Sequence, residues 1–107
     1  MAQIVNGYVL APRANLVSAD FRGADLRNAD LRFAYLRGAK IQGATLAGAK
    51  LQDTDFQDAD LRRADLRGAN LRGADLRGAD LREARLVGAN LTDAKLEGAQ
   101  LEGAERS

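Results

Sequence analysis

The side chains of this chain that could do chemistry are carboxylates and guanidinium groups. The 107 residues include no histidine and no cysteine, which excludes thiol nucleophiles, the common zinc sites and any catalytic triad whose base is an imidazole. Aspartate and arginine instead recur two residues apart, as in Asp60 and Arg62 or Asp80 and Arg82. Aspartates held close together could bind a divalent cation or share a proton as an acid–base pair. The element that positions them therefore decides what they can do.

A five-residue repeat positions these side chains. From Ala14 to Ala104 every fifth residue is alanine, with the exception of Thr54. A large apolar residue, usually leucine, follows each of these residues two positions later as far as Leu101. Residues 14–103 therefore form eighteen pentapeptides in one register, in which alanine is the first position, leucine the third and, in many units, glycine the fifth.

A period of five fits neither a helix nor a flat strand. Five residues do not complete a whole number of helical turns, so the leucines would scatter around a helix. Five is also odd, so the leucines would alternate between the two faces of a strand. A short extended piece followed by a corner restores the phase, because the first and third residues then point inward and the second points outward. Four such corners close a square coil of four pentapeptides, and we expect an all-β solenoid.

The unit Ala-Asp-Leu-Arg-Gly, at residues 64–68 and 74–78, resembles the A-(D/N)-L-x-x signature of the pentapeptide repeat family. The resemblance covers residues 14–103. It implies a right-handed quadrilateral β-helix, a pentapeptide repeat solenoid, of about 4.5 coils, in which each coil depends on its neighbours for burial.

A coil of four pentapeptides would stack outward carboxylates above one another. Asp60 would lie beside Asp80, and Asp55 beside Asp75. Nearby arginines neutralise these pairs, so we interpret them as solvated ladders and expect no catalytic residue, no metal site and no cofactor. Each arginine of the winding arginine rows also lies near an aspartate, and no aromatic residues are interleaved for base stacking. We therefore do not expect a nucleic-acid partner.

Three outward apolar residues depart from the repeat. Phe33 occupies a corner where glycine or a polar residue is usual, Tyr35 replaces the outward aspartate or asparagine, and Val17 lies one coil below the face of Tyr35. We predict that these three residues form a binding patch, with incidental exposure as the alternative. Thr54 beside Phe56 is interpreted as core accommodation of the larger ring.

The two ends of the repeat array are expected to differ. Residues 1–13 contain Asn6-Gly7 between β-prone pairs, which predicts a hairpin or a degenerate half-coil over the first coil. Residues 104–107 are expected to form a short tail, which leaves the last coil, with Leu96 and Leu101, uncapped. Stacking two such ends would cover their apolar side chains, so we predict a homodimer through the C-terminal coil.

Charge and hydropathy narrow the class of protein. The formal net charge is +1, and no apolar run approaches the length of a membrane span. The N-terminus has no positive region before its short apolar stretch, unlike a signal peptide, and the lack of cysteine favours a reducing compartment. We expect a cytoplasmic protein that does not enter membranes.

These observations predict a non-enzymatic structural or protein-interaction module, a rigid rod whose protein partner the sequence does not name. The family resemblance implies an alternative, because some members mimic DNA and protect or inhibit DNA gyrase. That mechanism requires a strongly acidic rod, whereas every coil here is close to neutral. A designed or consensus repeat scaffold is a third possibility.

Overall fold

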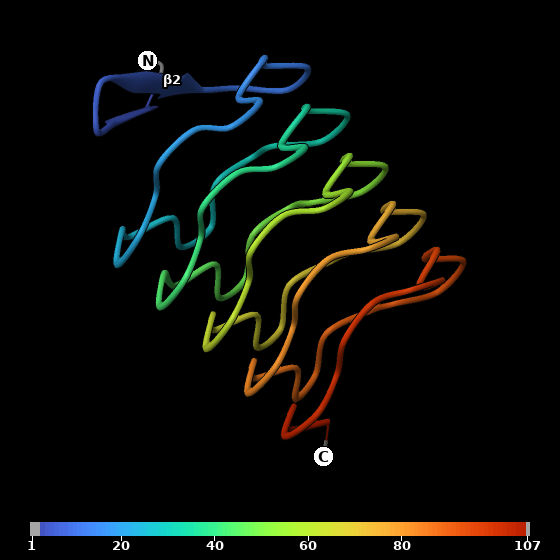
Figure 1. Ribbon diagram of the computed structural model, residues 1–107. Helices are drawn as coiled ribbons and strands as arrows, with labels where there is room; N and C mark the ends of the chain where they lie inside the picture. Colours follow the sequence, from blue (N-terminus) through green and yellow to red (C-terminus); the bar gives the residue numbers. More distant parts are fainter. Residues whose placement is uncertain (1–2, 107) are drawn as a thin grey trace.

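The computed structural model describes residues 3–106 as a rod of stacked coils (Figure 1). The molecule measures 35 × 23 × 22 Å, and its coils follow one another along the long axis. The fold is an all-β, right-handed quadrilateral β-helix, as the repeat and the family resemblance predict. No helix within residues 3–106 has the length and apolar character needed to cross a bilayer.

Parallel bridges between residues four repeats apart set the register of the coils. They run without a break from the pair Asn15 and Tyr35 to the pair Arg85 and Glu105. Each bridge joins the second-position residues of two stacked repeats. The coil of four pentapeptides that the period predicts is therefore confirmed.

In the coils that have a neighbour on both sides, four of the five amides in a repeat follow one hydrogen-bonding pattern. The second-position N–H donates to the preceding coil, and the third-position and fifth-position N–H groups donate to the following coil. The first-position N–H of the next repeat closes a turn onto the third-position carbonyl. The repeat that begins at Ala34 gives the distances: Tyr35 N to Ala14 O 2.9 Å, Leu36 N to Asp55 O 2.7 Å, Gly38 N to Gln57 O 3.0 Å and Ala39 N to Leu36 O 3.0 Å.

Every corner has a left-handed backbone conformation at its fifth position. The φ angles at these corners lie between 57° at Asp53 and 76° at Gly88. Together with the turn hydrogen bond, a positive φ at this place defines a type II β-turn, in which glycine is favoured. Several corners nevertheless carry a side chain in this conformation, among them Phe33, with a φ of 62°.

Leucine and alanine ladders fill the inside of the rod. The third-position side chains from Phe21 to Leu81 are at most 1% exposed, and the first-position alanines beside them are buried as well, except Ala24, which is partly buried. Thr54 is 0% exposed, and its hydroxyl donates a hydrogen bond of 2.8 Å to the carbonyl oxygen of Leu31. This bond makes a hydroxyl acceptable at a buried alanine position.

The N-terminal segment has the hairpin form of the two forms that were expected. Strands β1 (Gln3–Val5) and β2 (Tyr8–Leu10) pair antiparallel across Asn6-Gly7, whose positive φ angles of 53° and 81° fit the type I′ turn of an Asn-Gly hairpin. The Tyr8 ring packs against the Phe21 ring of the first coil at a centroid distance of 5.0 Å. The hairpin therefore covers part of this end of the core.

The C-terminal segment corrects one expectation. Ala104 and Glu105 do not form a tail, because Glu105 N donates to Ala84 O at 2.9 Å and the Glu105 carbonyl accepts from Leu86 N. The ladder therefore continues into a nineteenth unit, in which Arg106 takes the leucine position, while residue 107 lies outside the described residues. Leu96 and Leu101 are half-buried, unlike the leucines of the middle coils.

The inward and outward assignment can be tested with neighbouring residues. Leu66 is 0% exposed and has coils on both sides, so Leu66→Ala should lower the free energy of unfolding by about 2–5 kcal/mol through the cavity it leaves. Arg67→Ala removes an exposed side chain and should change it by less than about 0.5 kcal/mol. Chemical denaturation measures both variants, and similar losses would contradict the assignment.

Candidate interaction surfaces

The outward aspartates and arginines form one repeated unit. In the repeat of Asp80 and Arg82, the arginine donates from Nε to Oδ1 at 2.9 Å and from Nη2 to Oδ2 at 2.7 Å. The backbone N–H of Arg82 also donates to Asp80 Oδ1, at 3.1 Å. The same three bonds recur at Asp20, Asp25, Asp30, Asp60, Asp65 and Asp75.

Backbone hydrogen bonding explains why aspartate and asparagine occupy the second position. The fourth-position amide is the one that neither the ladder nor the turn uses, and a buried or half-buried N–H without a partner is costly. A short side-chain oxygen two residues earlier reaches this amide, as in an Asx turn. Asn70 does the same for the N–H of Arg72 at 3.1 Å, without any charge. These carboxylates therefore have a structural role.

The arginine partners lower the pKa of the paired aspartates. The side-chain hydrogen bond from Arg22 is the main cause that lowers the pKa of Asp20 to about 2, and Arg27 does the same for Asp25. The pKa values of Asp60, Asp65, Asp75 and Asp80 are also lowered, in each case mainly by the side-chain hydrogen bond from the arginine two residues on. At neutral pH these aspartates are thus ionised and paired, which does not suit a proton donor.

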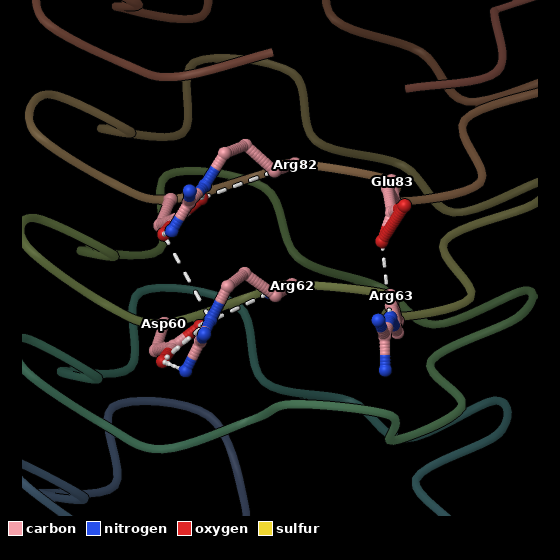
Figure 2. Close-up of polar contacts among 6 residues, drawn as sticks. Asp60, Arg62, Arg63, Arg82 and Glu83 are labelled. Carbon is pink, nitrogen blue, oxygen red and sulfur yellow. Dashed lines mark hydrogen bonds and ion pairs between the residues drawn. The ribbon is translucent and has the colours of Figure 1, made fainter. Parts of the chain in front are cut away.

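In the stack of Asp60 and Asp80, an arginine lies within ion-pair distance of both carboxylates (Figure 2). Arg62 Nη2 lies 2.6 Å from Asp60 Oδ2, and Arg62 Nε lies 3.8 Å from Asp80 Oδ2. Arg82 Nη2 pairs with Asp80 Oδ2 at 2.7 Å. Beside them, Arg63 pairs with Glu83 at 3.0 Å across the next corner. Residues 3–106 contain no group of three or more side chains placed to hold a metal ion. The shallow groove of about 780 Å³ along this surface is lined by four of these paired residues, Arg62, Arg63, Arg82 and Glu83, and by Gln42, Gly43, Glu102 and Gly103.

The three residues of the predicted patch all lie at the surface. Val17 is 52% exposed, Phe33 45% and Tyr35 52%. Phe33 and Tyr35 flank the buried Ala34 at one corner. Asn15, the bridge partner of Tyr35, lies two residues before Val17, so Val17 is diagonal to Tyr35 in the preceding coil. The register thus places Phe33 at one edge of this face, Tyr35 beside it, and Val17 towards the other edge in the preceding coil.

Two features at the N-terminal end were not anticipated from the sequence. The Arg13 guanidinium lies over the Phe33 ring at 5.1 Å from its centroid, a cation–π contact. The separation of Arg13 and Phe33 by four repeats was the available signal, since it makes them vertical neighbours. Ile4 and Val9 form a cross-strand pair on the outer face of the hairpin and are 65% and 49% exposed. In the sequence, the alternation of side chains between the two faces of each short strand was the signal that could have indicated this exposed pair.

The fold and the repeat define a class of β-solenoid protein, and the sequence match gives the family. Residues 14–53, 40–78 and 69–105 match the family model described as pentapeptide repeats (8 copies). The chain therefore belongs to the pentapeptide repeat family. No curated protein matches the chain in sequence.

Solved structures of the same family are similar to the chain. Rfr23, a pentapeptide repeat protein from the cyanobacterium Cyanothece 51142, is 40% identical over 83% of this chain and 60% of its own, with a TM-score of 0.82. A pentapeptide repeat protein from the Arabidopsis thaliana thylakoid lumen is 37% identical over 85% of this chain and 63% of its own, with a TM-score of 0.82. QnrB1, a plasmid-mediated fluoroquinolone resistance protein, is 26% identical over 84% of this chain and 47% of its own, with a TM-score of 0.52. The chain thus spans about three fifths of the length of the first two structures.

Acid should weaken the rod because the paired aspartates have lowered pKa values. A carboxyl whose pKa is lower in the folded than in the unfolded chain stabilises the fold above its ordinary value, near 3.8 here, and this stabilisation is lost as the pH falls towards about 2. The thermal midpoint should therefore be flat from neutral pH to about pH 5 and then fall, which circular dichroism melts would measure.

The variant Asp20→Asn with Asp25→Asn is the matched control for this pH dependence. Asparagine keeps an oxygen for the N–H of Arg22 or Arg27 and removes the titrating charge. Its midpoint should fall less between pH 5 and pH 2 than that of the unchanged chain. Identical pH profiles would show that these ion pairs do not cause the loss of stability.

Proposed function

We propose that the chain is a non-enzymatic protein-interaction module, a rigid rod that binds a protein partner through the patch of Val17, Phe33 and Tyr35. The regular repeats favour a scaffold, because their inward side chains form the core and most of their aspartates accept backbone amides and arginines. The patch differs from this pattern because its side chains are apolar, outward and exposed.

Phe33 is the observation that carries the proposal. Its φ of 62° puts a bulky aromatic residue in the left-handed region, which costs roughly 1–2 kcal/mol relative to glycine. The ring is 45% exposed and the core does not need it. Contact with the Arg13 guanidinium offsets part of this cost at the surface. A strained, exposed aromatic side chain beside an exposed tyrosine has the chemistry of an interface anchor.

Tyr35 is a second residue that is unfavourable for the stability of the repeat at the same corner. As a second-position residue it has no oxygen placed to accept the N–H of Arg37, a bond that aspartate, asparagine or threonine forms in most other repeats. Tyrosine instead provides a large amphipathic surface with a hydroxyl group, as is common at protein interfaces. The two substitutions at this corner are thus unfavourable for the isolated repeat and favourable for a contact.

Affinity capture tests the patch. The chain would be immobilised and exposed to a lysate of the organism that encodes it, in parallel with the double variant Phe33→Ser, Tyr35→Asp. The variant should lose at least about tenfold of the captured partner, because truncating central aromatic anchors typically costs about 2 kcal/mol or more. The amount captured would be measured by quantitative mass spectrometry.

Val87→Ser is the matched control, since Val87 is an exposed apolar residue, 40% exposed, in another face of the rod. It should keep the partner. Equal loss in both variants, or a partner that survives the patch variant, would contradict the assignment. Recovery of DNA gyrase independent of the patch would support the alternative function.

The alternative of a gyrase protector has one supporting observation, the structural likeness to QnrB1. DNA mimicry needs a continuous acidic surface. Here the carboxylates of Asp60, Asp75 and Asp80 are paired with arginines at 2.6–2.7 Å, and the net charge is +1. The charge pattern therefore favours the protein-interaction module.

We also propose that the polypeptide of residues 1–107 forms a homodimer through the coil that contains Leu96 and Leu101. Both side chains are half-buried, and the amides of Leu96 and Leu101 have no backbone acceptor among the described residues. Light scattering should give twice the monomer mass of 11.5 kDa, and Leu101→Lys should restore the monomer mass. A monomer at high concentration, or a dimer indifferent to Leu101→Lys, would refute the contact.

A further inference from the structure

One side of the rod carries the unbalanced positive charge. The side defined by the third-position leucines Leu31, Leu51, Leu71 and Leu91 bears three cations and one carboxylate, a net charge of +2. On each of the other three sides, cations and carboxylates at the second and fourth positions are equal in number. We call this side the basic face, which consists of Asp30, Arg32, Lys50, Gln52, Asn70, Arg72, Asn90 and Thr92.

Two cations of the basic face form no ion pair within 4.0 Å among residues 3–106, although Lys50 is the bridge partner of Asp30 in the preceding coil. Arg32 pairs with Asp30 at 2.7 Å. Lys50 and Arg72 are exposed and form no ion pair among residues 3–106, although eight other arginines pair within or between repeats. Lys50 also cannot accept the N–H of Gln52, so the backbone requirement that explains aspartate at this position does not explain lysine.

The two asparagines of the basic face offer donors. Asn70 Oδ1 accepts the N–H of Arg72 at 3.1 Å, and Asn90 Oδ1 accepts the N–H of Thr92 at 3.0 Å. With their oxygens engaged, the two side chains keep their NH₂ groups as donors. Lys50 and Arg72 contribute only donors. The middle of the face is therefore suited to a ligand that supplies acceptors and negative charge.

The two edges of the basic face differ. The corner that follows the face bears Asp53 and Asp93, which disfavour an anion there. The corner that precedes it bears Asn28, Gly48, Gly68 and Gly88, none of which carries a charge. An anionic ligand would therefore lie towards the glycine corner, along Lys50, Asn70 and Asn90.

We propose that the basic face docks an acidic, extended segment of a partner protein. This inference rests on the proposed function, since it names the chemistry of a second contact to a protein. Coils are spaced about 4.8 Å apart and alternate residues of a strand about 6.6 Å apart. Lys50 and Arg72 lie in neighbouring coils at opposite ends of a repeat, so about 8 Å separates their backbone positions. Carboxylates on alternate residues of an extended segment can reach both cations.

The number of free cations favours an acidic peptide over a nucleic acid. Affinity for duplex nucleic acid is largely set by how many phosphates are neutralised, with a salt slope of about −0.9 for each one. Two free cations would neutralise about two phosphates, and the affinity gained in this way is too small to hold a nucleic acid at physiological salt. The basic face also presents no aromatic side chain on which a base could stack.

Fluorescence anisotropy with a labelled poly-glutamate peptide tests the proposal. The unchanged chain should bind the peptide at low ionic strength, and salt should weaken the binding. The double variant Lys50→Gln, Arg72→Gln should bind about tenfold more weakly. The matched control is Lys40→Gln, Lys95→Gln, which removes the same net charge from two other faces, where neither lysine forms an ion pair among residues 3–106. It should stay within about twofold of the unchanged chain.

The outcomes separate this inference from the proposed function. Absence of peptide binding, or equal losses in the two double variants, would overturn it. Tighter binding of a single-stranded oligonucleotide that also depends on Lys50 and Arg72 would assign the face to nucleic acid and overturn it as well. The variant Phe33→Ser, Tyr35→Asp should still bind the peptide, so failure here leaves the capture experiment intact. Thermal melts of each variant would check that these exposed substitutions leave the fold in place.

Discussion

The fold depends on satisfying the backbone N–H groups in a coil of only four pentapeptides. Four of the five amides in a repeat find backbone acceptors, three of them in neighbouring coils. The remaining amide, at the fourth position, has none, and in most repeats a short side chain two residues earlier supplies the oxygen. This requirement puts aspartate or asparagine at the second position, and aspartate in turn attracts arginine two residues later. About half of the charged side chains therefore follow from backbone hydrogen bonding.

Function is consequently best sought where a residue fails to meet this requirement. Phe33 departs from the corner preference for glycine, while Tyr35 and Lys50 depart from the second-position preference for a short acceptor. These departures weaken the isolated repeat and expose an aromatic ring, a hydroxyl or an unpaired cation. The two proposed contacts arise from them, one apolar and one electrostatic. The corner at Phe33 adjoins the basic face, because Phe33 N–H donates to the Gln52 carbonyl at 3.0 Å. One partner could therefore contact both surfaces.

The sequence allowed the repeat, the inward side chains, the four-repeat register and the pairing of Asp60, Asp75 and Asp80 with arginine to be predicted. These features follow from a strict period, because every repeat has the same inward and outward positions and one repeat therefore predicts the others. The predicted end of the ladder was wrong by one unit, because Arg106 at the leucine position gave no signal that Ala104 and Glu105 still pair with the preceding coil. The Arg13–Phe33 contact was missed because it depends on the conformations of two long side chains, which the period does not determine.

The four-sided register has a consequence for how such a chain can change length. Inserting four pentapeptides adds a complete coil and leaves every column of side chains aligned. Inserting a single pentapeptide keeps the alanine and leucine ladders intact, yet it turns everything beyond the insertion by a quarter of a revolution about the rod axis. The carboxylates and guanidinium groups now stacked at Asp60, Arg62 and Asp80 would then face different neighbours. The core is thus indifferent to the number of repeats, while the pattern on each side depends on that number modulo four.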